Sequence, residues 1–377
     1  MRVTDYELYP LPGKSQLLKL ETSTGLVGWG EPVVEGKTES TAAAVETMLS
    51  EYLLGEDPLP TEDHWGTMYR GGFYRGGPVL MSAIAGIDQA LWDIKGKHFD
   101  APIYELLGGK ARDRIKLYRW THGAPEGIAE DIATGVENGF RAFKMNAVSE
   151  ALGRVDAPAR VEDAVERVEA ARDAIDSDKD LAVDFHGRVA KPMAKHLLRA
   201  LEPAEPLFVE EPVLPEHSDS LPEIATATTT PLATGERLFS RHDFKPLLEA
   251  GGVDVVQPDL SHAGGITEVK KIASLAESYD AALAPHCPLG PIALASCLQI
   301  DACAPNAMIQ EQSILRDGVP EYVDNPEVFE RLDDGYLDFP EGPGLGVEID
   351  EDRLDDQAGE PWSAPVWRHT DGSIAEQ

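Results

Sequence analysis

Three carboxylates recur along the middle of this chain at a constant interval. Asp184, Glu210 and Glu236 are separated by 26 residues each, and each follows a short apolar stretch. This interval corresponds to one strand–helix unit, so the three side chains are expected at the ends of adjacent parallel strands. Carboxylates gathered without a compensating Lys or Arg repel one another unless a cation lies between them. Oxygen ligands favour Mg²⁺, with Mn²⁺ as the second choice, so the spacing predicts a metal site.

Two histidines are expected at the same edge of the sheet. His186 follows Asp184 by two residues, and strand alternation would direct both side chains to the same face. His286 ends the seventh predicted strand and Asp259 ends the sixth, which makes them neighbours. A carboxylate beside an imidazole fixes its tautomer and strengthens it as a base. These residues predict acid–base chemistry beside the metal site.

Further functional groups end the second and eighth predicted strands. Lys144 and Asn146 end the second strand, and Glu311 lies in the eighth. Lys144 is interpreted either as a buried base or as an ion-pair partner, and Glu311 either as a substrate-binding group or as a surface acid. The segment Gly71–Gly77 is rich in glycine and is either a mobile lid or a sharp turn. The spacing leaves each of these pairs of alternatives open.

The elements that position these groups alternate between short strands and amphipathic helices. Helical periodicity is found, for example, over Val161–Ile175, Lys191–Leu201 and Glu268–Tyr279. Eight strands in this pattern predict a (β/α)8-type barrel, with an open doubly wound sheet as the alternative. No GxGxxG motif follows the first strand, which argues against the dinucleotide-binding form of that sheet. The predicted strands are Arg114–Trp120, Ala142–Asn146, Leu181–His186, Pro206–Glu211, Pro231–Glu236, Val253–Asp259, Ala281–His286 and Asn306–Gln312.

The chain is expected to divide into three parts. Residues 1–112 form an α+β domain, with a hairpin over residues 15–30 and a helix over residues 80–97. The helix is predicted from an apolar stripe made by Leu80, Ile84, Ile87, Leu91 and Ile94. Residues 113–335 form the barrel, and residues 336–377 are expected to return to the N-terminal domain.

The composition limits the partners and the location of the protein. Of the 377 residues, 67 are acidic and 33 basic, so the formal net charge is −34. This charge excludes the basic footprint of a nucleic-acid-binding protein and argues against docking on anionic membranes. Such self-repulsion is screened in strong salt, which predicts a salty cell interior, as in a halophile. Three cysteines without CxxC spacing, and no apolar run of about 20 residues, predict a soluble protein in a reducing cytoplasm.

Around these residues the sequence resembles the enolase superfamily, in its mandelate racemase/muconate lactonizing branch. Within that branch it is most similar to the sugar-acid dehydratases that act on D-galactonate and related aldonates. The resemblance extends nearly from end to end and includes the Gly71–Gly77 loop and the helix around Asp88–Lys97. The motifs that carry it are Phe143–Asn146, Val183–Arg188, Phe208–Val213, Gly235–Arg237, Gln257–Gly265, Ala284–Pro291 and Gln310–Ser313.

The resemblance implies a fold and a role for each site residue. The fold would be a (β/α)7β barrel with an α+β capping domain built from the N-terminal region and the C-terminal segment. Asp184, Glu210 and Glu236 match the Mg²⁺ ligands of the family. The match also gives His286 with Asp259 as the dyad that removes the α-proton, His186 as the acid that protonates the departing 3-hydroxyl, and Glu311 as the group contacting the substrate carboxylate or enolate.

The implied reaction is the dehydration of a sugar acid to a 2-keto-3-deoxy sugar acid. The substrate would be an aldonate such as D-galactonate, D-gluconate or D-xylonate, bound by a cytoplasmic homo-oligomer. Substrate contacts are expected from Lys144, Asn146, Trp120 and Tyr74.

Three alternative functions are considered beside this one. Many family members carry Lys-x-Lys on the second strand, so Asn146 argues against the first alternative, a two-base racemase or epimerase of a 2-hydroxy acid. The second is a non-catalytic sugar-acid-binding barrel, which predicts gaps in the acid–base set. The third is a glycoside hydrolase that uses Glu210 and Glu211, which is rejected here because adjacent strand residues face opposite ways.

Overall fold

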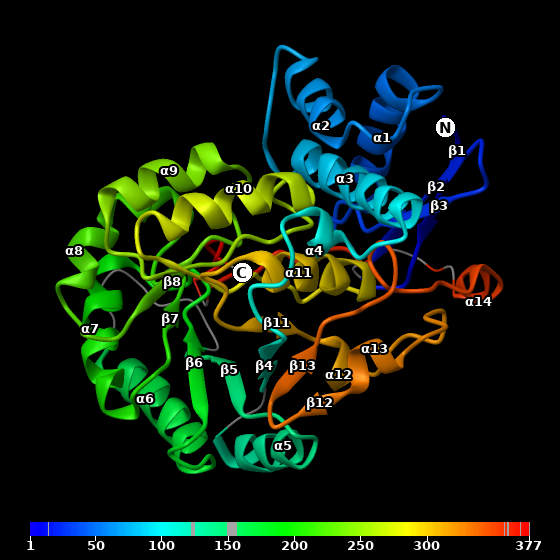
Figure 1. The fold of residues 1–377 in the computed structure, drawn as a ribbon. Helices are drawn as coiled ribbons and strands as arrows, with labels where there is room; N and C mark the ends of the chain where they lie inside the picture. The colour runs from blue at the N-terminus through cyan, green and yellow to red at the C-terminus, as the bar shows by residue number, and fades with distance from the viewer. Residues whose placement is uncertain are drawn as a thin grey trace.

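The computed structural model describes the chain except residues 14, 122–124, 149–156, 358, 360, 361, 370 and 377, and except the side chains of residues 125, 126, 316 and 317. An N-terminal α+β part lies against one end of a barrel (Figure 1). The elements of the N-terminal part are β1 (Val3–Pro10), β2 (Gln16–Thr22), β3 (Val27–Gly30), α1 (Thr38–Met48), α2 (Thr61–Arg70), α3 (Pro78–Phe99) and α4 (Ile103–Leu106).

The N-terminal part packs a helix tightly on a small antiparallel sheet. Strands β2 and β3 pair as the predicted hairpin, with Leu18 opposite Gly30. Helix α3 covers this sheet with its apolar side chains, and the predicted helix over residues 80–97 is confirmed. A Cβ atom at Gly30 would overlap the carbonyl oxygen of Gly86 in α3, so the close approach of strand and helix requires glycine there.

The barrel is built from eight parallel strands, as the sequence predicts. Neighbouring strands pair in chain order from β4 to β10, and β11 pairs with β4. The remaining gap, between β10 and residues 306–308, is bridged by hydrogen bonds of Leu283 with Asn306 and Met308, both 2.8 Å. The strands are β4 (Arg114–Trp120), β5 (Ala142–Asn146), β6 (Asp180–Asp184), β7 (Val209–Glu210), β8 (Leu232–Thr234), β9 (Val255–Val256), β10 (Ala282–Leu283) and β11 (Gln310–Gln312).

Helices alternate with these strands and surround the barrel (Figure 1). Their apolar residues join those of the strands in one large buried cluster, which includes Val168, Leu197 and Ile266. The helices are α5 (Pro125–Glu137), α6 (Pro158–Asp173), α7 (Lys191–Leu201), α8 (Leu221–Ala225), α9 (Arg241–Ala250), α10 (Gly265–Glu277) and α11 (Pro291–Cys303). Strand–helix alternation around a closed parallel sheet therefore confirms the predicted fold class.

The C-terminal segment contacts both parts of the molecule. Strand β13 pairs antiparallel with β4, whereas Leu345 donates its backbone N–H to Asp93 in α3 at 2.9 Å. Farther on, the backbone N–H of Trp362 donates to the carbonyl of Gly13 at 2.8 Å. The domain boundaries at residues 112 and 335 stay predictions. This segment and the residues that lead into it contain α12 (Ile314–Asp317), α13 (Glu327–Glu330), β12 (Leu332–Asp333), β13 (Tyr336–Asp338) and α14 (Glu351–Asp356).

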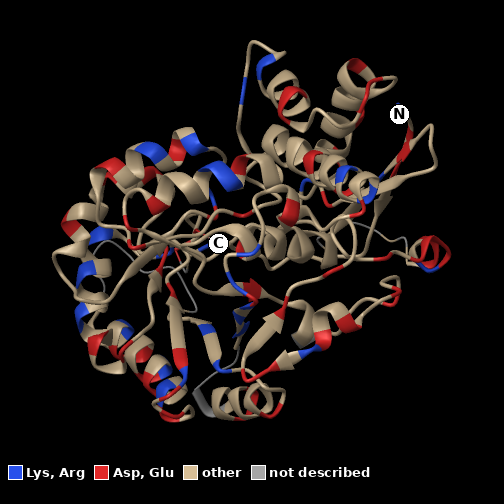
Figure 2. Ribbon diagram, viewed as in Figure 1, with Lys and Arg blue, Asp and Glu red and all other residues tan. Residues whose placement is uncertain are grey.

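Acidic residues are spread over both parts of the molecule and are not collected in one tail (Figure 2). Lys and Arg are scattered between them and are about half as numerous, at 33 against 67. Within the described residues, no helix is both long and apolar enough to cross a membrane.

Candidate active site

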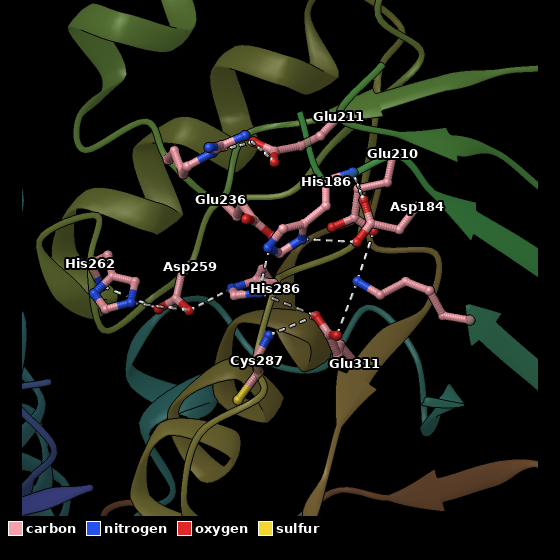
Figure 3. Close-up of polar contacts among 12 residues, drawn as sticks. Asp184, His186, Glu210, Glu211, Glu236, Asp259, His262, His286, Cys287 and Glu311 are labelled. Atoms are coloured by element: carbon pink, nitrogen blue, oxygen red, sulfur yellow. Dashed lines mark hydrogen bonds and ion pairs between the residues drawn. The ribbon is translucent and has the colours of Figure 1, made fainter. Parts of the chain in front are cut away.

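The strand ends bring the predicted residues together at one edge of the barrel (Figure 3). In the parallel register, Asn146 on β5 lies beside Asp184 on β6, and Asp184 lies beside Glu210 on β7. The backbones of Asp259 and His286 also pair directly, which confirms their predicted adjacency. The residues come from distant parts of the sequence, and the closed sheet is what collects them.

His286 is oriented by Asp259. Its Nδ1 lies 2.8 Å from the Asp259 Oδ2, and its Nε2 lies 3.1 Å from the Glu236 Oε2. The other oxygen of Asp259 accepts the backbone N–H groups of Ser261 at 2.7 Å and His262 at 3.2 Å, so the carboxylate is fixed. Burial lowers the pKa of His286, but Glu236, Glu311 and Asp259 together raise it well above its usual value.

His186 pairs with Asp184 through both its ring and its backbone. Its Nδ1 lies 3.1 Å from the Asp184 Oδ2, and its backbone N–H donates to the Asp184 Oδ1 at 2.6 Å. Burial lowers the pKa of His186, but the adjacent Asp184 outweighs this effect, and the pKa rises to about 9. The pairing with Asp184 favours the protonated imidazole, which can act as an acid.

Lys144 is a fully buried cation that links two of the acids. Its Nζ lies 2.7 Å from the Glu210 Oε2 and 3.0 Å from the Glu311 Oε1. Burial lowers the pKa of Lys144, but Glu210 and Glu311 raise it well above its usual value, which favours the ion-pair partner over the buried base. The expectation that no Lys or Arg compensates the three strand-end carboxylates was therefore wrong for Glu210, which pairs with Lys144.

Glu211 reaches the same site as its neighbour Glu210, which corrects the prediction that the two face opposite ways. Strand β7 ends at Glu210, and Glu211 has a φ of 40°, so strand alternation stops there. Ligand atoms of His186, Glu211 and Glu236 lie within 4.8 Å of one another. Arg237 stabilises this arrangement, because its Nε lies 2.9 Å from the Glu211 Oε1.

The acids at this site fit a divalent cation. Burial raises the pKa values of Glu210 and Glu211 to about 8, and repulsion from neighbouring carboxylates adds to the effect. The Oε1 of Glu210 is buried and has no hydrogen-bond partner among the described residues. A buried carboxylate oxygen without a partner costs free energy that a bound cation would remove. The ligand set Asp184, Glu210 and Glu236 stays a prediction, beside the group of His186, Glu211 and Glu236.

Of the other predicted residues, three lie at the site and one does not. The indole N–H of Trp120 donates to the Glu311 Oε1, and the Glu311 Oε2 accepts the backbone N–H of Cys287 at 3.1 Å. The Oδ1 of Asn146 is buried without a partner among the described residues. Tyr74 is 86% exposed and packs against Phe73, outside the residues that line the cavity, so its contact with substrate stays a prediction.

A cavity of about 970 Å³ opens over these groups. Both histidines, Glu236 and Asn146 line it from the barrel. Trp120, another predicted contact, lines it as well. Other parts of the wall were not predicted as site residues, and they come from both ends of the chain and from several loops after the barrel strands. These additional lining residues include Leu11, Pro12, Val34, Glu35, Arg188, Arg237, Trp362 and Trp367.

The fold and the site together define a member of the enolase superfamily. Residues 14–108 match the N-terminal domain of mandelate racemase/muconate lactonizing enzymes, and residues 127–353 match the enolase C-terminal domain-like family. The chain belongs to this family.

Curated relatives and solved structures give closer comparisons. The chain is 53% identical to the D-galactonate dehydratase of Variovorax paradoxus and 52% identical to that of Cronobacter sakazakii, over the full length of each. A crystal structure of an enolase from Agrobacterium radiobacter, with bound Na and L-malate, is 30% identical with a TM-score of 0.90 and full coverage of both chains. A mandelate racemase/muconate lactonizing enzyme from Jannaschia sp. CCS1 is 30% identical with a TM-score of 0.87, covering 96% of this chain and 98% of that one.

Proposed function

We propose that the protein is a hydro-lyase that dehydrates an aldonate, with D-galactonate as its substrate, to a 2-keto-3-deoxy sugar acid. The observation that carries the proposal is a pair of histidines in one cavity, each held by its own buried carboxylate. Removal of an α-proton and loss of a hydroxyl need one base and one acid, which this pair supplies. The full-length similarity to D-galactonate dehydratases supports the choice of substrate.

His286 acts as the base through its Nε2. Among the neighbouring charges, Glu236 raises the pKa of His286 most. When the Glu236 carboxylate binds another partner in place of His286, Nε2 is free to accept the C2 proton. Asp259 holds Nδ1–H and stabilises the imidazolium that forms. His186, in its protonated form, donates its proton to the 3-hydroxyl, which leaves as water. The resulting enol tautomerises to the 2-keto acid.

A divalent cation is part of the proposal. Asp184, Glu210 and Glu236 would hold Mg²⁺, or Mn²⁺ as the second choice. Bound there, the ion supplies positive charge that stabilises the ene-diolate formed from the substrate carboxylate. Trp120, Lys144 and the backbone of Cys287 fix Glu311 beside this position, where it can contact the substrate carboxylate.

The location and assembly of the enzyme complete the proposal. The enzyme is a homo-oligomer in the salty cytoplasm of a halophile and has no nucleic-acid or membrane partner. This part of the proposal rests on the charge of −34 and on the family resemblance.

A screen of aldonates in high salt tests the function. We expect 2-keto-3-deoxy product from D-galactonate, loss of activity in EDTA and recovery with Mg²⁺, with D-gluconate and D-xylonate as comparison substrates. A product that keeps its 2-hydroxyl but is inverted at C2 would identify a racemase instead, and no turnover of any aldonate would contradict the proposal.

Variants separate the two histidines. His286→Asn should abolish both C2 proton exchange and dehydration, whereas His186→Asn should abolish dehydration and retain some C2 exchange. Mg²⁺ affinity, measured by titration, serves as the control for an intact site. If His286→Asn exchanges the C2 proton at the wild-type rate, the assignment of the base is wrong.

A further inference from the structure

Arg188 lines the cavity, and among the described residues it has no anionic partner within ion-pair distance. It follows His186 by two residues on the loop after β6 and is half-buried at the cavity wall. Its Nε is buried with no hydrogen-bond partner, and no described carboxylate forms an ion pair with its guanidinium. In a chain with 67 acidic and 33 basic residues, an arginine in this position has an unused set of planar donors.

The carboxylates near Arg188 already have other cationic partners, as the neighbouring Arg237 shows. Arg237 lines the same cavity, but its guanidinium is bound to the carboxylate of Glu211 at 2.9 and 2.5 Å. Glu211 therefore has its cation, and Asp184 is already paired with His186. Arg188 is the arginine in this wall whose donors remain available to a molecule in the cavity.

The ring of Trp367 holds the Arg188 guanidinium at 4.9 Å from its centroid. Trp367 belongs to the C-terminal tail, which is anchored upstream by the 2.8 Å hydrogen bond from Trp362 to Gly13. Downstream, its carbonyl accepts the N–H of Ala375 at 3.0 Å. The upstream bond ties the tail to the N-terminal part, and the downstream bond is a turn within the tail itself. A stacked guanidinium keeps its N–H edge free for hydrogen bonding.

The position of this pair indicates which end of a substrate it meets. Under the proposed function, both histidines and Glu236, which line the cavity, take the reacting carbons C1 to C3. Arg188 lies on the loop beyond the strand, and Trp367, which stacks on it, comes from the C-terminal tail that lines the same cavity. The pair therefore faces the part of the cavity that remains for the substrate carbons beyond C3.

We propose that Arg188, held against Trp367, binds the hydroxyl oxygens at the end of the sugar acid farthest from C1 and so selects for a six-carbon chain. The inference rests on the proposed function. The planar fork of a guanidinium donates two hydrogen bonds to neighbouring oxygens, which matches two hydroxyls on adjacent carbons. A second carboxylate at the same end offers the same acceptor chemistry, and the experiment below distinguishes the two.

The test compares Arg188→Met and Arg188→Lys with the wild-type enzyme on a chain-length series. The substrates are D-galactonate and the five- and four-carbon aldonates with the same configuration at C2 and C3. Where turnover is absent, the shorter acids are measured as competitive inhibitors. We expect Arg188→Met to lower kcat/KM on D-galactonate by about 10- to 100-fold, through KM, with less than about threefold change on the four-carbon acid. Arg188→Lys should recover only a small part of the loss, because it lacks the fork.

Two further variants separate this role from a structural one. Trp367→Ala should give the same dependence on chain length, and Trp367→Phe should largely preserve the wild-type pattern. The matched control is Arg114→Met, because Arg114 also stacks on an aromatic ring, that of Tyr336 at 4.6 Å, but lies at the start of β4 and does not line the cavity. It should behave as wild type on every substrate.

The outcomes are distinct from those that test the proposed function. Equal losses on all chain lengths, or no loss on D-galactonate, would overturn the role of Arg188 while leaving the dehydratase in place. A larger effect of Arg188→Met on the six-carbon aldarate than on D-galactonate would show that Arg188 recognises a second carboxylate, and would overturn selection by hydroxyls. If the wild-type enzyme turns over no sugar acid, the proposed function fails first.

Discussion

Replacement of Asp259 by Asn tests the base without changing the size of any side chain. The Asp259 Oδ1 accepts two backbone N–H groups, from Ser261 at 2.7 Å and from His262 at 3.2 Å. Those donors need an acceptor, so the amide oxygen of the introduced Asn must take this place. Its NH₂ group then faces the Nδ1 of His286, which lies 2.8 Å from the Asp259 Oδ2. The imidazole proton is forced onto Nε2, the atom that should accept the C2 proton.

The expected loss follows from this wrong tautomer. In the serine protease triad, the same exchange of an orienting Asp for Asn lowers the rate about 10⁴-fold with the geometry intact. A factor of 10⁴ corresponds to about 5.5 kcal/mol in the activation barrier. We therefore expect Asp259→Asn to slow both C2 exchange and dehydration of D-galactonate by about 10⁴-fold, without weakening Mg²⁺ binding.

The measurement is deuterium incorporation at C2, followed by NMR in D₂O, alongside formation of the 2-keto product. His286→Asn should lose at least as much activity as Asp259→Asn, and the double variant should lose little more than His286→Asn, because the two residues act as a unit. Activity of Asp259→Asn within tenfold of wild type would refute the reasoning, as would losses that multiply in the double variant.

Three further predictions concern stability. Lys144→Met leaves Glu210 and Glu311 buried without their cation and should lower the free energy of unfolding by about 3–5 kcal/mol in denaturant titrations; a loss below about 1 kcal/mol would contradict the ion-pair role. Burial raises the pKa of Asp88 to about 7, above its value near 4 in the unfolded chain. The contribution of Asp88 to the free energy of unfolding is therefore highest below pH 4, where its carboxyl is protonated in both states, and it falls as the pH rises from 4 through 7. Between pH 5 and pH 8, wild type should therefore lose about 3 kcal/mol relative to Asp88→Asn in urea unfolding, and parallel pH profiles would disprove this. The net charge of −34 predicts that the thermal midpoint rises when KCl is increased from 0.1 to 2 M, since screening shortens the Debye length from about 10 Å to under about 3 Å; a flat or falling midpoint would speak against adaptation to salt.

The barrel and the dyad could be predicted because both follow from strand order. Each parallel strand delivers its last residue to the same edge, so finding Asp259 and His286 at consecutive strand ends was enough to make them neighbours. The predicted bounds of β4 and β5 are confirmed, but the later strands were predicted too long, since β9 and β10 contain two residues each. Strand ends are set by where the backbone pairing stops, and a hydrophobic pattern does not mark that point.

The remaining parts of the site depend on backbone turns and on contacts between distant segments. Glu211 joins the acids because its φ is 40°, and the adjacent sequence carries no glycine that would indicate such a turn there. His186 also has a positive φ, at 53°, so it reaches Asp184 through a turn and not through the strand alternation that predicted the contact. Trp367 could not be placed, because its position depends on the fold of the N-terminal part, more than 300 residues earlier in the chain.

The cavity wall takes residues from Leu11 to Trp367, and this arrangement couples ligand binding to the ends of the chain. A protease cut before Trp362 would release the tail and open the distal side of the cavity, but the strand-end acids and histidines would keep their partners. A ligand that contacts Trp367 would lower the rate of that cut, because those contacts are lost when the tail is released. Protection of residues 362–367 from proteolysis would thus report occupancy of the distal end independently of any chemical step.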